Sequence, residues 1–234
     1  MNSDMARKTL VALLGAVALA AGGATFAAAA PAAAGSDLAA AAAQVDTSNP
    51  QKLVQSSAQA LLTQLDAHRA EYRKDPAKIE PLVDQILLPH FDVEYSARLV
   101  LGRHWNSASA EQRQAFIQAF YKSMLSNYGS YLVDFTADKL KVLPWSGDAN
   151  AQYATVRTQL RKSDGSTVSV NYGLHRTADG WKVWDVVIEG ISYVKSFRDD
   201  FGEEIDQRGL DAVIKRLQSG AKPAAIGNAQ NGGG

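Results

Sequence analysis

The chain has 234 residues and carries 24 lysines and arginines against 24 aspartates and glutamates, so its formal net charge is zero. Its length allows one large domain or two small ones, at roughly 100–200 residues per domain. Balanced charge argues against a nucleic-acid binder, because neutralising phosphates needs a basic face. The absence of cysteine excludes disulfides, zinc–thiolate sites, thiol nucleophiles and lipid attachment through an N-terminal cysteine.

Residues 1–30 have the layout of a secretory signal peptide. A basic Arg7-Lys8 pair precedes an apolar run over positions 10 to 21, and small residues suitable for cleavage lie between positions 27 and 34. The apolar run is too short for a membrane span, which takes about 20 residues. The alternative is a buried core helix. We predict that residues 1–30 are removed during export.

The rest of the chain divides by composition. Residues 31–51 are rich in alanine with little apolar pattern, so we expect a flexible lead-in there. Residues 220–234 are polar and rich in glycine and cannot bury a core, which predicts a disordered tail. Residues 52–219 are expected to form a single domain.

Helical spacing dominates the first part of that domain. It predicts helices over 52–73, from Asp75-Pro76 to Pro89, over 92–101 and over about 110–134. The last of these begins with a capping box, Ser109 with Gln112.

The apolar period changes to two after residue 139. Strands are expected over 140–145, 153–161, 168–174 and 181–188, separated by turn residues, and they predict an antiparallel sheet of about four strands. Alternation in the last strand places Val183 and Val187 on one face and Trp184, Val186 and Ile188 on the other. Helices over 192–206 and 210–217 complete an α+β fold, in which N-terminal and C-terminal helices pack with the sheet.

No catalytic motif stands out. The sequence has no G-x-S-x-G, H-E-x-x-H, P-loop or dinucleotide fingerprint. His90 and Asp92 lack a third ligand, so we predict no metal site. Asp185 in its apolar strand is either a general base or a structural carboxylate that hydrogen-bonds the turn at 190–192, and we favour the structural role. We therefore predict that the chain is not an enzyme.

The informative feature is an excess of large apolar residues on one sheet face and two helical stripes. These candidate contacts are Phe116, Phe120, Tyr128, Val156, Val170, Tyr172, Val186, Ile188, Tyr193 and Phe197. The pattern alone favours a filled core over a cavity between the sheet and the helices over 110–134 and 192–206, because helix-on-sheet packing demands the same residues.

Several segments occur in an order that resembles a known family. They are ILLPHFD (86–92), ARLVLGRHW (97–105), AEQRQAF (110–116), WKVWDV (181–186), EGIS (189–192) and GLDAVI (209–214). Over roughly 52–218 the chain resembles the MlaC family, periplasmic phospholipid shuttles that are also called toluene-tolerance or organic-solvent-tolerance auxiliary proteins.

The resemblance implies an apolar cavity that holds the acyl tails of a glycerophospholipid, with the ten candidate residues as its lining. It implies a periplasmic monomer without a cofactor, whose cargo is phospholipid. Its partners would be an inner-membrane ABC transporter complex with MCE domains and an outer-membrane lipoprotein–porin complex, and its role would be to maintain outer-membrane lipid asymmetry. Two other classes stay open: an isomerase-like enzyme on a cone-shaped helix-and-sheet fold using Asp185, and a ligand-free adaptor.

Overall fold

The computed structural model describes residues 32–134, 136, 139–148, 150–161 and 165–221, without the side chains of residues 32–36, 128 and 131. The expected signal peptide and nearly all of the expected tail lie outside the described residues. Within them, helices precede an antiparallel sheet, and two more helices follow it.

The N-terminal helices are α2 (Ala32–Ala43), α3 (Pro50–Lys74) and α4 (Ile79–Ile86), with 3-10 turns η2 (Pro76–Lys78) and η3 (Leu88–His90). The Asn49 side chain accepts a hydrogen bond from the Lys52 backbone N–H, and Pro50 occupies the first turn, which explains why α3 begins there. The sequence predicts a flexible lead-in over 31–51, whereas the structure places α2 within it and buries Ala41.

The middle helices are α5 (Val93–Leu101), α6 (His104–Ser107) and α7 (Ala110–Tyr128), followed by the 3-10 helix η4 (Gly129–Asp134). Asp92 caps α5 by accepting a hydrogen bond from the Tyr95 N–H at 2.9 Å. The predicted capping box at the start of α7 is confirmed, since both the Ser109 and Gln112 side chains make their reciprocal bonds. The helix predicted over 110–134 tightens to 3-10 geometry in its last turns.

The sheet has five strands in sequence order, each antiparallel to the next: β1 (Leu140–Val142), β2 (Tyr153–Arg161), β3 (Thr167–Thr177), β4 (Gly180–Ile188) and β5 (Ile191–Ser192). The sequence predicts about four strands. The fifth has two residues and forms because Glu189 and Gly190, at φ values of 50° and 82°, turn the chain back onto β4.

The structure confirms which alternate residues of the strands lie on the buried face of the sheet. Val156, Tyr172 and Val186 pair across three strands, and Val170 pairs with Ile188 in the next row. Residues that pair across strands share a face of the sheet.

A β-bulge corrects the prediction for the first half of β4. Gly173 pairs with Asp185 and Leu174 with Val183, so Trp184 is an extra residue in β4. Val183 therefore joins Val186 on the buried face. Trp184 turns to the other face, where its ring lies edge-on to Tyr95 at 5.9 Å between ring centroids.

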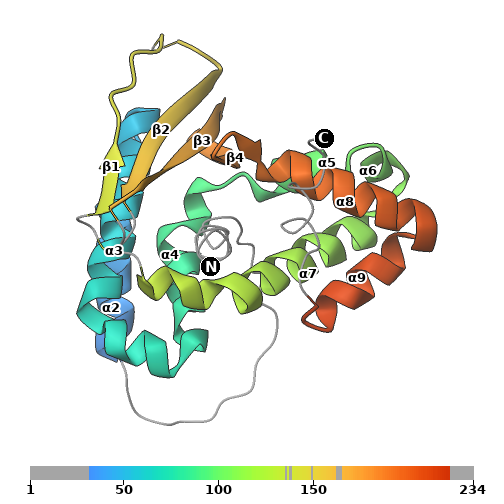
Figure 1. Cartoon of the computed structure of the whole chain (residues 1–234), viewed down its shortest axis with the longest axis horizontal. Coiled ribbons are helices and arrows are strands. Elements are labelled where there is room, and N and C mark those ends of the chain that lie inside the picture. The colour runs from blue at the N-terminus through green and yellow to red at the C-terminus, as the bar shows by residue number, and fades with distance from the viewer. Residues whose placement is uncertain (1–31, 135, 137–138, 149, 162–164, 222–234) are drawn as a thin grey trace.

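The C-terminal helices are α8 (Tyr193–Arg208) and α9 (Leu210–Gln218). Gly209, at φ 81°, separates them. In Figure 1, α3 runs beside β1, β2 and β3, whereas α5, α7, α8 and α9 gather beyond β4. Contacts agree with this arrangement, because α3 contacts β1 and β2 while α5 and α8 contact β4.

Candidate functional site

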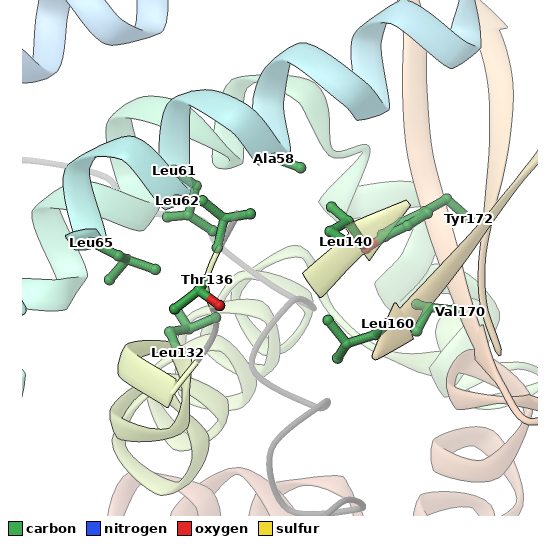
Figure 2. Close-up of a pocket in the computed structure, with 10 residues that line it drawn as sticks. All are labelled: Ala58, Leu61, Leu62, Leu65, Leu132, Thr136, Leu140, Leu160, Val170 and Tyr172. Carbon is green, nitrogen blue, oxygen red and sulfur yellow. The ribbon is translucent and has the colours of Figure 1, made fainter. Parts of the chain in front are cut away.

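Three small apolar cavities follow one another through the core. The first, which we call the sheet cavity, lies between α3, η4 and the buried face of the sheet. It is lined by Ala58, Leu61, Leu62, Leu65, Leu132, Thr136, Leu140, Leu160, Val170 and Tyr172. Figure 2 shows the leucines of α3 beside Leu132 and Thr136, with Val170 and Tyr172 on the strand side.

The second, the junction cavity, lies where α3 meets η3 and the sheet. Its lining is Leu53, Val54, Ser57, Ala58, Leu87, His90, Phe91, Tyr172 and Val183. Phe91 reaches this position because it forms an isolated parallel bridge with Val183, and the Asp92 N–H donates to the Val183 carbonyl at 2.8 Å.

The third, the aromatic cavity, lies among α5, α7 and α8. Its lining is Phe91, Val93, Ser96, Ala97, Val100, Ile117, Phe120, Tyr121, Val194 and Phe197. The rings around it are held in specific geometry: Phe116 stacks on Phe120 at 5.7 Å between centroids, and Phe120 meets Phe197 edge-to-face at 4.9 Å.

The cavities share lining residues. Ala58 and Tyr172 belong to both the sheet cavity and the junction cavity, and Phe91 belongs to both the junction cavity and the aromatic cavity. Each has a volume of about 30 Å³, which leaves room for one or two water molecules and far too little for an acyl chain. A continuous apolar path therefore needs Phe91, Tyr172 and their neighbours to shift.

The polar groups along this path are uncharged near neutral pH. Burial raises the pKa of the Tyr172 hydroxyl above its ordinary value. Burial, with the nearby Lys182 charge as a smaller cause, lowers the pKa of His90. Such a path suits an apolar ligand that carries neutral polar groups.

A wider groove of about 380 Å³ lies between α2 and α3. Its lining includes Asp37, Gln44, Ser56, Gln59, Thr63, Gln64 and His68. The other four lining residues are alanines, and with so many polar side chains between them the groove suits an aliphatic ligand less well than the three apolar cavities do.

The Asp185 carboxylate hydrogen-bonds the turn before α8, as the structural role favoured by the sequence requires. It is 4% exposed; Ser192 Oγ donates to its Oδ2 at 2.6 Å, and the Val194 N–H donates to its Oδ1 at 3.1 Å. Burial raises its pKa, although these hydrogen bonds act in the opposite direction. Both oxygens are thus engaged in fixing the turn that starts α8.

Candidate metal sites and membrane-spanning helices are both absent from the described part of the chain. No group of three or more His, Cys, Asp or Glu side chains there is placed to hold a metal ion. No helix within the same residues is long and apolar enough to cross a membrane.

Comparison with protein families gives a match over residues 55–219 to the family described as MlaC protein, which is well over half of the chain. The chain belongs to the MlaC family.

Two curated relatives agree with this assignment. The intermembrane phospholipid transport system binding protein MlaC of Haemophilus influenzae is 26% identical over 184 residues, covering 77% of this chain and 86% of that protein. The toluene tolerance protein ttg2D of Pseudomonas putida is 28% identical over 168 residues, covering 71% of this chain and 78% of that protein.

A solved structure supports the fold. The phospholipid-binding protein from Ralstonia solanacearum, determined in complex with a phospholipid, matches with a TM-score of 0.60 and 23% identity. The match covers 71% of this chain and 95% of that one. The α+β fold expected from the sequence is confirmed.

The structure divides the candidate residues of this MlaC-family chain into two groups. On the strands, Val170 and Tyr172 line cavities, while Val156, Val186 and Ile188 are buried beside them. On the helices, Phe120 and Phe197 line the aromatic cavity, while Phe116 and Tyr193 are buried around it. The side chain of Tyr128 lies outside the described residues.

These two groups do not face each other in the way the sequence predicts. Across the sheet cavity, Val170 and Tyr172 face the leucines of α3 rather than α7 and α8. Phe91 connects the two groups, because it lines a cavity with each.

Sequence reasoning missed Ser57, Phe91 and the leucines of α3 as candidates. The helical stripe over 52–73 was a usable indication of a buried helix face, but periodicity does not say which surface that face covers. Phe91 offered no periodic indication, because its bridge to Val183 joins distant parts of the chain.

Proposed function

We propose that the protein is a periplasmic carrier that binds glycerophospholipid by its acyl chains and shuttles it between the outer and inner membranes. The single observation that carries the proposal is the row of apolar cavities, linked through Ala58, Tyr172 and Phe91, in a chain of the MlaC family. The relatives named for phospholipid transport and phospholipid binding support it.

The energetics favour an enclosed carrier. Two acyl chains have about 30 methylenes, and at about 0.8 kcal/mol each their exposure to water costs roughly 24 kcal/mol. An apolar interior resembles the bilayer, so exchange between a membrane and the protein can be nearly balanced. Crossing the aqueous periplasm would then need no nucleotide hydrolysis by this chain.

Binding requires the cavities to widen. Each holds about 30 Å³, so an acyl chain enters only if α3 moves away from the sheet or the rings of Phe91 and Tyr172 rotate. In the proposed bound state, Val170 and Tyr172 contact one part of the lipid and Phe120 and Phe197 another. Phe116, Val156, Val186, Ile188 and Tyr193 form the surrounding wall, and Tyr128 remains a proposed contact.

The proposal extends to location and partners. Residues 1–30 direct export and are removed, and the mature monomer exchanges lipid with an inner-membrane ABC transporter complex with MCE domains and an outer-membrane lipoprotein–porin complex. By carrying phospholipid across the periplasm, it would maintain outer-membrane lipid asymmetry. N-terminal sequencing of mature protein should begin between positions 28 and 35; a chain that still begins at Met1 or Met5 contradicts export.

Mass spectrometry after organic-solvent extraction of the purified protein tests the central claim. We expect co-purified glycerophospholipid, and we expect delipidated protein to take up phospholipid from vesicles. Protein that is lipid-free and takes up none would contradict the proposal.

No observation favours the enzyme alternative. Asp185 is 4% exposed and lines none of the three cavities, so no described cavity brings a substrate within reach of its carboxylate. The ligand-free adaptor predicts a core without linked cavities, and lipid extraction separates it from the carrier.

A further inference from the structure

Ser57 on α3 is a buried polar residue with no hydrogen-bond partner in the described part of the chain. Its side chain is 7% exposed, and its Oγ makes no hydrogen bond to any of the described residues. A buried hydroxyl that has lost water without gaining a partner destabilises the fold. Alanine would fill nearly the same space without this penalty, so packing alone does not explain a serine here.

Other helical serines of the chain satisfy their hydroxyls locally. The hydroxyls of Ser56, Ser96 and Ser196 each donate to the carbonyl four residues earlier, at 2.7 to 2.9 Å. Ser57 lies beside one of them on the same helix and does not make this bond. Its hydroxyl therefore remains available to a group inside the junction cavity.

The position of Ser57 suits a ligand with two apolar arms. The junction cavity that it lines connects to the sheet cavity through Ala58 and Tyr172, and to the aromatic cavity through Phe91. Tyr172 and His90 supply the other polar side chains of the junction lining. Apolar space thus extends in two directions from a small polar centre.

A glycerophospholipid has the matching chemistry. Each acyl chain begins at an ester carbonyl, which accepts hydrogen bonds but donates none, whereas a serine hydroxyl can donate. We propose that the Ser57 hydroxyl donates a hydrogen bond to an ester carbonyl of the bound lipid at the junction cavity, an assignment that rests on the proposed carrier function. Ser57 is then a specificity residue that favours ester-linked over ether-linked lipids.

The test compares two lipids that differ only in their two ester carbonyls. Delipidated mature protein is loaded with a fluorescent phospholipid, which is then displaced by vesicles of diacyl phosphatidylglycerol or of its di-O-alkyl analogue with the same chains. We expect wild type to favour the diester by about threefold to tenfold, the range of one neutral hydrogen bond. Ser57→Ala should reduce this preference to nearly one while leaving binding of the diether unchanged.

Thr158→Val is the matched control. Thr158 is 1% exposed on the buried sheet face, but its Oγ1 already donates to the Val170 carbonyl at 2.8 Å. Its removal should leave the preference for the diester intact. A second readout is the infrared carbonyl band of bound lipid labelled with carbon-13 at the ester, which should lose its hydrogen-bonded component in Ser57→Ala.

The outcomes separate this inference from the proposed function. Equal weakening of both lipids by Ser57→Ala, or an unchanged preference for the diester, would overturn the role of Ser57 and leave the carrier standing. Wild-type protein that binds neither lipid would overturn both.

Discussion

The two apolar regions of the molecule are built differently. The leucine region, formed by Leu61, Leu62 and Leu65 of α3 against η4 and the sheet, contains aliphatic side chains around the sheet and junction cavities. The aromatic region, formed by Phe116, Phe120, Phe197 and Phe201 of α7 and α8, contains rings in mutual stacked and edge-to-face contact.

Their polar atoms differ as well. In the aromatic region Ser96 Oγ lies 2.8 Å from both the Asp92 and Trp184 carbonyl oxygens. In the leucine region the buried Ser57 Oγ and Thr136 Oγ1 find no partner among the described residues. Unpartnered buried atoms also lie beside the aromatic region, at Trp184 Nε1 and Asp200 Oδ2, but neither residue lines the aromatic cavity. Ser57 and Thr136, in contrast, line cavities of the leucine region. We infer that the packed rings of the aromatic region chiefly stabilise the fold around its cavity, whereas the leucine region also offers the ligand polar contacts.

The largest effect should come from the aromatic region. Phe201→Ala removes a 0% exposed ring that meets Phe116 and Phe120 edge-to-face, each at 5.5 Å between centroids. We expect it to lower the free energy of unfolding by about 3–5 kcal/mol, by a similar amount with and without lipid. Denaturant titration of the lipid-bound and lipid-free forms measures this change. A loss of stability confined to the lipid-bound form would contradict the stabilising role of the aromatic region.

An intermediate effect on stability, with a large effect on binding, should come from the leucine region. Ala58→Phe places a ring between the sheet and junction cavities. Overpacking should cost about 1–3 kcal/mol, and the folded variant should lose most of its co-purified phospholipid. Mass spectrometry of solvent extracts, normalised to folded protein, measures the loss.

Ala70→Phe is the matched control on the same helix. Ala70 is exposed and lines none of the three cavities, so this variant has the same change in helix propensity without the obstruction. It should retain wild-type lipid content. Equal lipid loss in both variants would mean that the phenylalanine acts through α3 itself.

The smallest effect should come from Asp185, which orients α8 and with it the aromatic region. Asp185→Asn should leave lipid content unchanged and lower stability by about 1 kcal/mol at neutral pH. A folded variant that is lipid-free would assign the carboxylate a role in binding.

The effect of Asp185→Asn on the free energy of unfolding should depend on pH. Burial raises the folded-state pKa of Asp185 above its ordinary 3.8, so the native state binds this proton more readily than the unfolded state does. Wild type should therefore gain stability relative to Asp185→Asn as the pH falls from neutral through the raised pKa toward 3.8. Unfolding of both proteins at pH 7 and pH 4 measures this change, in which other titrating groups largely cancel.

Local sequence patterns predicted the helices and strands themselves better than they predicted which elements pack together. Alternation correctly placed Val156, Val170 and Tyr172 on one sheet face, because their strands are regular. It failed at Val183, because the extra residue Trp184 reverses the alternation and leaves no mark in the apolar pattern. The capping box at Ser109 was readable because both of its partners lie within one turn.

The candidate site was harder to predict than the fold. The sequence identified Tyr172, Phe120 and Phe197, which all line cavities, from their size and periodicity. It did not show that α3 covers Tyr172, since any amphipathic helix could satisfy the same face. Nor did it indicate Ser57, whose importance depends on the hydrogen bond that its hydroxyl does not make.

The bridge between Phe91 and Val183 also bears on how the chain reaches its native state. Nearby, Ser96 Oγ reaches the Trp184 carbonyl across 88 residues of sequence, so the segment after η3 docks only once β4 exists. Contacts of such long separation form late, because the loop-closure entropy must first be overcome. A nascent chain that ends before β4 would leave Phe91 without its bridge to Val183 and the β4-facing edge of β3 unpaired. We therefore expect the core to close only after more than three quarters of the chain has been synthesised. Until then the polypeptide should stay unfolded enough to pass through a translocation channel and should depend on chaperones.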